Sequence, residues 1–259
     1  MVQLEVERKF VPTIDFESRM SGFHNPCRVP FPLVGYSDDP SKWLIYSRLP
    51  DKLVRDTYFD LDNQLAKNGV WIRRRQELVV SSLGYTSAFS YQECESWQTK
   101  VRLGGDFVDS QVEEIEGERE AEVTLSEHIP GARLAGLATI ADLRTHRRTW
   151  EVCDAESSQY VQAIRVMLDT VSEAAVEGTH IGVFRHDVGE VEVTTEVEEG
   201  TDKTSKQITV DSLRCVLHEF MGRHGRLFPE EPKPVGKLSA YFQWVESTRA
   251  SSKNSSRKS

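Results

Sequence analysis

The sequence predicts one α+β domain built on a closed antiparallel β-barrel of about eight strands, with helices packed on its outer surface. Three observations support this fold class. Much of the chain alternates apolar and polar residues with the two-residue period of a strand. Only a few segments have helical spacing. Several strands also carry titratable residues on the face opposite an apolar one, which places charge inside the barrel if the apolar faces pack outward.

The alternation defines the expected strands, and a recurrence of apolar residues every three or four positions defines the expected helices. The strands cover residues 2–10, 54–60, 69–76, 95–103, 117–125, 146–154, 163–170, 180–186 and 188–197. The helices cover residues 132–143, 211–224 and 236–246. Asp211 is the expected N-cap of the second helix, and Gly225 is its expected stop.

The remaining segments predict loops and a tail. Residues 22–52 hold five of the ten prolines, which indicates a long excursion with little regular structure. Residues 80–92 are rich in Ser, Gly and Tyr, and residues 104–118 are rich in Gly and acids. Residues 247–259 are polar and basic, and we expect them to be a disordered tail. The folded domain is therefore expected to span residues 1–246.

The composition favours a soluble cytoplasmic protein. Of the 259 residues, 28% are charged and 38% are hydrophobic, and the net charge of −9 argues against a general nucleic-acid partner. No apolar run approaches the ~18 residues of a membrane span, and the N-terminus lacks the features of a signal peptide. The four cysteines form no CxxC pair, as expected for reduced thiols. We expect a monomer with no membrane partner.

The first predicted strand, residues 2–10, has an unusual second face. Its apolar residues share one face, whereas Glu5, Glu7 and Lys9 share the other, because side chains alternate along a strand. Two carboxylates two residues apart can point at one divalent cation. The lysine one step further can reach an anion bound to that cation. The pattern indicates a site for a metal ion and a phosphate.

The same period-two test finds charged faces on other strands. They carry Trp71, Arg73 and Arg75; Gln98, Lys100 and Arg102; Arg165, Met167 and Asp169; and Glu190 and Glu192. For any single strand, a solvated charged face is the simpler alternative. Their recurrence favours a lumen lined by both signs of charge. Because unpaired charges in a confined space are costly, a metal ion with a polyphosphate is a natural filling.

The residues resemble a known family at this point. Glu5-Val-Glu7-Arg-Lys9 is similar to the ExExK signature of the CYTH superfamily, the triphosphate tunnel metalloenzymes. Further elements follow in the family's order and extend the resemblance over residues 2–245. They are Arg55-Asp-Thr-Tyr58-Phe-Asp60, Trp71-Ile-Arg73-Arg-Arg75, Lys100, Arg147 before Thr149-Trp150, Asp169, Gly189-Glu190-Val-Glu192 and Lys237-Leu-Ser-Ala-Tyr241. Within the superfamily the chain looks most like thiamine triphosphatase.

The resemblance implies hydrolysis of thiamine triphosphate and a role for each matched residue. The implied ligands of Mg²⁺ (or Mn²⁺) are Glu5, Glu7, Asp169, Glu190 and Glu192. The implied triphosphate ligands are Lys9, Arg73, Arg75, Lys100, Arg147, Glu190 and Lys237, and Trp71 would pack against the thiamine. Lys100 and Tyr58 match a pair proposed to activate water, which requires a lysine of lowered pKa.

Two departures from the thiamine triphosphatase pattern leave the identity of the substrate open. The gaps between Lys9 and Arg55 and between Arg75 and Lys100 are longer than in the animal enzymes. These insertions fall at the tunnel mouth, where the organic part of a substrate would lie. Inorganic tripolyphosphate or a nucleoside triphosphate is therefore the alternative substrate. Cyclisation of ATP, a non-enzymatic polyphosphate-binding module and a polynucleotide 5′-triphosphatase are further alternatives, the last disfavoured by the acidic composition.

Overall fold

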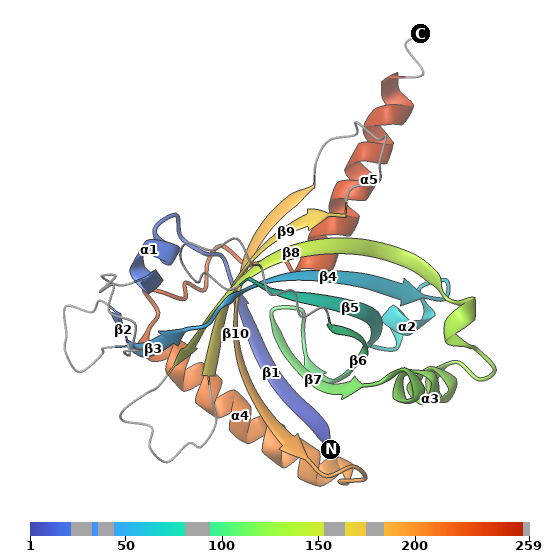
Figure 1. Ribbon diagram of the computed structural model, residues 1–259, viewed down its shortest axis with the longest axis horizontal. Helices are drawn as coiled ribbons and strands as arrows, with labels where there is room; N and C mark the ends of the chain where they lie inside the picture. Colours follow the sequence, from blue (N-terminus) through green and yellow to red (C-terminus); the bar gives the residue numbers. More distant parts are fainter. Residues whose placement is uncertain (22–32, 36–43, 81–93, 153–163, 175–183, 256–259) are drawn as a thin grey trace.

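The computed structural model describes all residues except 22–32, 36–43, 81–93, 153–163, 175–183 and 256–259. Its centre is a barrel of eight antiparallel strands (Figure 1). These are β1 (Val2–Phe10), β4 (Asp51–Asp60), β5 (Val70–Val80), β6 (Cys94–Gly105), β7 (Asp109–Glu116), β8 (Ala138–Val152), β9 (Ile164–Glu173) and β10 (Arg185–Val197). The predicted fold class is confirmed.

The barrel closes through one pairing between strands distant along the sheet. The order is β8-β4-β5-β6-β7-β1-β10-β9, and β9 pairs again with β8 from Leu143↔Glu173 to Val152↔Ile164. Two strands lie outside the closed ring. β3 (Leu44–Arg48) pairs with the end of β8, and β2 (Leu33–Gly35) pairs with β3. Both fall within residues 22–52, where the sequence predicts little regular structure.

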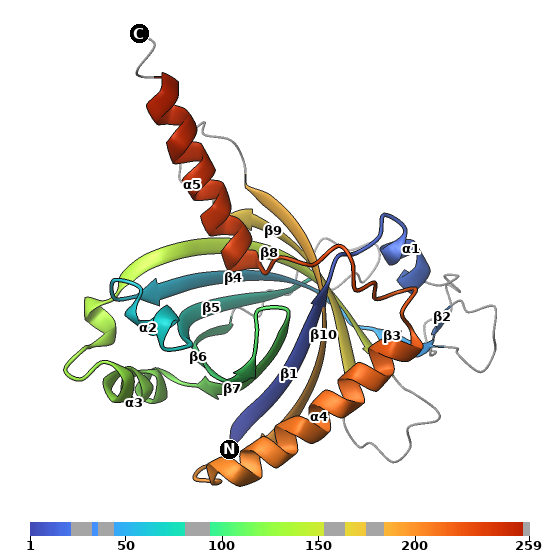
Figure 2. The ribbon, with the colours of Figure 1, turned by 180° about the vertical axis from the view of Figure 1, so that it is seen from behind.

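Helices cover the outside of the barrel. α4 (Lys203–Arg223) lies along β1 and β10 in both views of the chain (Figure 1, Figure 2). α1 (Phe16–Ser21), α2 (Gln64–Lys67) and α3 (Glu118–His128) are shorter. The first half of α5 (Lys237–Ser255) packs on β8 and β9, and its C-terminal part projects away from the barrel (Figure 2). Among the described residues, none of the helices is both long and apolar enough to cross a membrane.

The apolar core lies outside the barrel wall rather than in its lumen. Leu4 and Val6 of β1 and Val191 of β10 are fully buried against the inner face of α4, which contributes Leu213 and Leu217. Strands whose apolar faces point outward leave their other faces for the interior. This arrangement confirms the expectation that charged faces line the lumen, and it places Glu5 and Glu190 in buried positions.

Three predicted segments have a different structure. Residues 117–125, expected as a strand, form α3, because Ala121 and Leu125 bury one helical face and the apparent alternation is incidental. Residues 132–143, expected as a helix, contain a short 3-10 turn at Leu134–Gly136 and the start of β8, because pairing with β4 overrides the helical spacing. Residues 104–118, expected as a loop, contain β7.

The other differences concern element boundaries. α4 begins before the predicted 211–224, and its N-cap is Asp202, whose carboxylate accepts hydrogen bonds from Thr204 N and Ser205 N. The predicted helix 236–246 corresponds to α5, which continues to Ser255 and so includes part of the expected tail. The predicted strand 180–186 lies largely outside the described residues, as does the predicted loop 80–92. The proposed domain limit at residue 246 stays a prediction.

Gly189 is required by close packing at one end of the barrel. It faces Phe10 in the β1–β10 pair, and a Cβ at this position would lie 2.2 Å from the Phe10 ring. Phe10 cannot move freely because its ring packs 5.1 Å from Phe228 and 5.0 Å from Phe16. An added methyl group must therefore displace this aromatic cluster.

We expect Gly189→Ala to lower the free energy of unfolding by roughly 1–3 kcal/mol, the usual range for overpacking a buried site. Gly222→Ala is the matched control, because a Cβ there meets nothing within 4 Å and the residue lies in α4. That control should leave stability equal or slightly higher, since alanine favours a helix over glycine. Chemical denaturation of both variants measures the difference, and equal stabilities would contradict the packing argument.

Candidate active site

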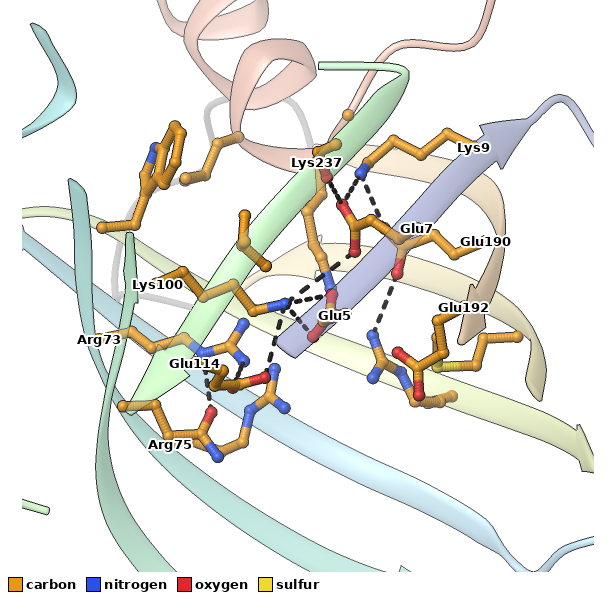
Figure 3. A pocket seen from close by; sticks show the side chains of 18 of the residues that line it. Glu5, Glu7, Lys9, Arg73, Arg75, Lys100, Glu114, Glu190, Glu192 and Lys237 are labelled. Carbon is orange, nitrogen blue, oxygen red and sulfur yellow. Dashed lines mark hydrogen bonds and ion pairs between the residues drawn. The ribbon is translucent and has the colours of Figure 1, made fainter. Parts of the chain in front are cut away.

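The interior of the barrel is a charged cavity of about 580 Å³. Each of the eight barrel strands contributes side chains to its lining, and the first turn of α5 contributes Lys237, Leu238 and Ser239. Figure 3 shows that these side chains converge from several strands into one space. The structure brings together in this cavity most of the predicted site residues: Glu5, Glu7, Lys9, Tyr58, Trp71, Arg73, Arg75, Lys100, Arg147, Glu190, Glu192 and Lys237.

Acids gather on one wall, where β1 and β10 pair. Glu7 lies directly opposite Glu192 in this pair, and Lys9 lies opposite Glu190. Two carboxylates facing each other across a strand pair are destabilising unless a cation compensates them. Burial is the largest contribution that raises the pKa of Glu192, and Glu7 raises it further. This wall therefore carries negative charge that the neighbouring cations neutralise only in part.

Lys9 is the first cation of the acidic wall. Its ammonium group donates a hydrogen bond to Glu7 and lies 3.6 Å from the Glu190 carboxylate. Ser110 of β7 donates a further hydrogen bond of 2.8 Å to Glu7. Burial alone would raise the pKa of Glu7, but Lys9 and Lys100 outweigh it and hold this pKa well below its ordinary value.

Lys100 of β6 connects the acidic wall to the opposite side. Its Nζ donates hydrogen bonds of 2.7 and 2.9 Å to the two oxygens of Glu5 and lies 3.7 Å from Glu114. Burial alone would lower the pKa of Lys100, but the carboxylates of Glu114 and Glu5 outweigh it and raise this pKa above its usual range. In this arrangement Lys100 is a partly buried cation held by two carboxylates.

Tyr58, the predicted partner of Lys100, lies on β4. It is buried and faces Arg73 across the β4–β5 pair. The structure thus places the tyrosine beside an arginine, while the lysine is held by Glu5. A water-activating role for the two residues stays a prediction.

Arginines form the wall opposite the acids. Arg73 donates a 2.9 Å hydrogen bond to Gln98 and a 3.1 Å hydrogen bond to Glu114. Arg75 binds the Asp56 carboxylate in a bidentate pair, with Nε–Oδ1 and Nη2–Oδ2 distances of 2.7 and 2.9 Å. These contacts fix both guanidinium groups in the barrel wall and leave them as cavity-lining residues.

Asp169 has a different environment from the other predicted metal ligands. It is fully buried, accepts hydrogen bonds of 2.8 and 2.6 Å from Arg147, and accepts one of 3.0 Å from Lys237. It is not among the residues that line the cavity. In this structure Asp169 holds two cations of the site, one on β8 and one at the start of α5.

Among the acids that sequence reasoning missed are Glu114, which lines the cavity, and Asp56, which holds Arg75 in its wall. Glu114 lies on β7, in a segment whose Gly and acid content predicts a loop. The available signal is the alternation of Ser110, Val112 and Glu114, which all line the cavity. Asp56 lies inside a quoted motif, but only the β4–β5 register shows that it faces Arg75.

The fold and this site define a class of protein: a closed barrel whose lumen is lined by buried acidic and basic side chains. A family model for the CYTH domain matches residues 49–215, and the chain belongs to this family. The family comprises metal-dependent triphosphate tunnel enzymes and includes triphosphatases that act on phosphoanhydride bonds. The match does not include β1 or α5, whose residues nevertheless complete the same cavity.

Several solved structures are similar to this chain at low identity. One is a candidate adenylyl cyclase from Hippeastrum described as having a dominant triphosphatase activity, with 15% identity, coverage of 93% of this chain and 95% of that chain, and a TM-score of 0.46. Another is a candidate adenylate cyclase from Vibrio parahaemolyticus, with 13% identity, coverage of 93% and 99%, and a TM-score of 0.43. No curated protein matches the sequence.

Proposed function

We propose that this chain hydrolyses a phosphoanhydride bond of a triphosphate inside the barrel, with the help of a divalent cation. The observation that carries the proposal is the convergence of several buried acids and several buried cations on one cavity. Acids occupy the β1–β10 wall, and Lys100, Arg73 and Arg75 face them. Such a cavity suits a polyanion bound on one side by lysines and arginines and on the other by a metal ion.

The cations of the cavity would bind and orient the triphosphate. Lys9, Arg73, Arg75, Arg147 and Lys237 each bind a carboxylate in the present structure. A bound triphosphate would take over part of these contacts. Phosphoanhydride hydrolysis needs little covalent chemistry from the protein, so orientation and charge neutralisation account for most of the expected rate enhancement. The start of α5 adds backbone N–H groups that favour an anion.

The acidic wall fits a hard divalent cation. Carboxylate oxygens are the ligands that Mg²⁺ and Mn²⁺ prefer. Burial raises the pKa of Glu5 well above its ordinary value, and the carboxylates of Glu7 and Glu114 raise it further, against the opposing effect of Lys100. This crowding indicates that the wall lacks positive charge. In the present side-chain arrangement, the described residues contain no group of three converged ligands, because lysines hold Glu5 and Glu7.

The residues that would hold the ion are Glu5, Glu7, Glu190 and Glu192. Asp169, the fifth predicted ligand, binds Arg147 and Lys237 in this structure, and its role as a metal ligand stays a prediction. When bound, the ion would neutralise phosphate oxygens. Mg²⁺ is the proposed ion and Mn²⁺ the alternative.

A cytoplasmic location and a monomeric state stay predictions from the sequence.

Thiamine triphosphate is the substrate that the resemblance indicates, and the position of Trp71 in the cavity lining supports it. An indole face is a good partner for the cationic thiazolium. Inorganic tripolyphosphate or a nucleoside triphosphate is the second candidate, and it needs no aromatic partner. The choice between them is made by direct comparison of the three substrates.

We expect phosphate release from at least one of thiamine triphosphate, tripolyphosphate and ATP in the presence of Mg²⁺, and its loss by at least about a hundredfold when EDTA removes the ion. Restoring excess Mg²⁺ should restore the rate. An equal rate in EDTA would contradict the metal proposal. Formation of cyclic AMP from ATP without release of inorganic phosphate would replace hydrolysis by cyclisation.

A further inference from the structure

Arg102 differs from every other cation that lines the cavity. Among the residues that the structure describes, each of the other cavity-lining lysines and arginines has a carboxylate within 4.0 Å, as for Lys52 with Glu77 and Arg165 with Glu192. Arg102 has none, and its buried Nε has no hydrogen-bond partner among these residues. A guanidinium group without a partner in a charged cavity is available to bind an anion.

Two aromatic rings hold this guanidinium in place. The Arg102 Cζ lies 4.9 Å from the centre of the Trp71 ring and 4.6 Å from the centre of the Phe107 ring. Phe107 is 59% exposed, so the cluster lies where the cavity meets solvent. We name Trp71, Arg102 and Phe107 the mouth cluster. The two rings lie edge-to-face, with centroids 6.4 Å apart, and contact with both limits the motion of the arginine.

The backbone around Arg102 is also specialised. The β6–β7 register shifts between Arg102 and Gly104, and such a bulge redirects the side chains next to it. Arg102 N donates a 2.8 Å hydrogen bond to Gly69 O. Gly69 has φ +71, and a Cβ there would lie 3.1 Å from Arg102 Cβ. This glycine therefore allows the arginine to lie close against the end of β5.

The nearest hairpin acid does not neutralise Arg102. Asp106 lies at the tip of the β6–β7 hairpin, and its Oδ1 accepts hydrogen bonds of 2.7 and 2.9 Å from Val108 N and Asp109 N. These bonds close the hairpin and support Phe107 between them. The carboxylate thus serves the turn, and hydrogen bonds from Asp109 N and Val108 N lower its pKa, with smaller contributions from Lys233 and Arg102. No ion pair within 4.0 Å joins it to Arg102 among the described residues.

On the basis of the proposed function, we propose that Arg102 is an anion-binding subsite at the mouth that selects triphosphates by the charge of their distal end. It favours a substrate that ends in a further anionic group, such as inorganic tripolyphosphate. It disfavours a substrate that ends in a thiazolium cation. The thiazolium would need the Trp71 ring face, which the positively charged Arg102 guanidinium already occupies. Trp71 then serves mainly as a support for Arg102.

The test compares kcat/KM for tripolyphosphate and for thiamine triphosphate in wild-type protein and in Arg102→Gln. We expect the variant to lose roughly 10- to 100-fold on tripolyphosphate, mainly through KM, as for loss of one charge-assisted hydrogen bond. Thiamine triphosphate turnover should stay equal or rise a few-fold. Arg102→Lys keeps the charge and should retain most of the preference. Arg74→Gln, on the outer face of β5, is the control for loss of an arginine.

Equal losses on both substrates would mean that Arg102 contacts phosphates that they share, and unchanged rates would mean that it contacts neither; each result overturns the subsite. If wild-type protein hydrolyses neither substrate, the proposed function fails instead. In that case, isothermal titration calorimetry in EDTA compares the affinity of wild-type protein and of Arg102→Gln for tripolyphosphate. Equal affinities would overturn the proposed subsite. Circular dichroism of each variant excludes unfolding as the cause.

Discussion

Replacing Glu7 with glutamine is expected to reduce phosphate release by at least about a hundredfold while the barrel stays folded. Glu7 lies opposite Glu192 on the acidic wall, and its carboxylate is ionised because Lys9 and Lys100 lower its pKa. Glutamine has nearly the same shape and can still accept the hydrogen bond from Ser110, but it brings no charge to a metal ion. Initial rates in saturating Mg²⁺ measure the loss.

Glu192→Gln is expected to lower activity without lowering stability. Because burial raises the pKa of Glu192, the folded protein disfavours its ionised form, and a neutral residue relieves that cost. We therefore expect this variant to lose activity like Glu7→Gln but to melt at an equal or higher temperature in EDTA. Added Mg²⁺ should raise Tm of the wild type and raise it less in either variant.

The control for both variants is Glu113→Gln. Glu113 lies on β7, but it faces outward and forms a 2.7 Å ion pair with Lys206 of α4. Its loss removes the same charge from the protein without removing it from the cavity, so the rate should stay close to the wild-type rate. Near-wild-type turnover in Glu7→Gln and Glu192→Gln at saturating Mg²⁺ would exclude the acidic wall as the metal site.

Carboxylates of the site hold most of its lysines and arginines, and this has a consequence for the binding of a triphosphate. Glu5 holds Lys100, Glu7 holds Lys9, and Asp169 holds Arg147. A triphosphate must compete with these carboxylates for the same lysines and arginines. Its affinity therefore depends on whether a divalent cation neutralises the carboxylates instead. Binding of the triphosphate and of a divalent cation should therefore be mutually reinforcing.

The sequence predicted the walls of the site because period-two alternation is a local property. Glu5, Glu7 and Lys9 share a face in any strand, and so do Arg73 and Arg75, whichever strands become their neighbours. The closure of the barrel is not local. The β8–β9 pairing and the Glu7↔Glu192 register depend on the whole sheet. For this reason the individual faces could be predicted, but the contacts between them could not.

The error at residues 132–143 has the same origin. Leu134, Leu137 and Ala141 have helical spacing, yet the second half of this segment joins β8, because pairing with β4 satisfies its backbone. The mouth cluster could not be predicted from the sequence either. Phe107 belongs to a hairpin tip with no periodic signal, and its contact with Arg102 depends on a bulge. Where local preference and sheet pairing disagree, the sheet decides the structure.

Asp56→Asn is expected to lower the free energy of unfolding by about 3–5 kcal/mol, the usual cost of breaking a buried ion pair. Asp56 is 1% exposed and bound to Arg75, with Arg73 at 3.7 Å. Removing its charge leaves two buried guanidinium groups without their main partner. Urea denaturation at neutral pH measures the change, and the residual activity of the folded fraction reports whether both arginines keep their positions.

Asp142→Asn is a matched control, because Asp142 binds Arg55 with the same bidentate geometry on the solvent side of the barrel, at 2.9 and 2.6 Å. An exposed pair is worth less than ~1 kcal/mol, so the two substitutions should differ by several-fold in their effect. Similar losses would show that burial does not determine the strength of these pairs.

The pH dependence gives an independent check on Asp56. Burial alone would raise its pKa, but Arg73 and Arg75 outweigh it and hold the pKa below the ordinary range. A depressed folded-state pKa contributes stability that is present above the unfolded-state value and is lost as pH falls. The stability gap between wild type and Asp56→Asn should therefore be constant above about pH 5 and narrow below about pH 4. A gap that stays constant down to acid unfolding would show that the carboxylate is not stabilised by the arginines.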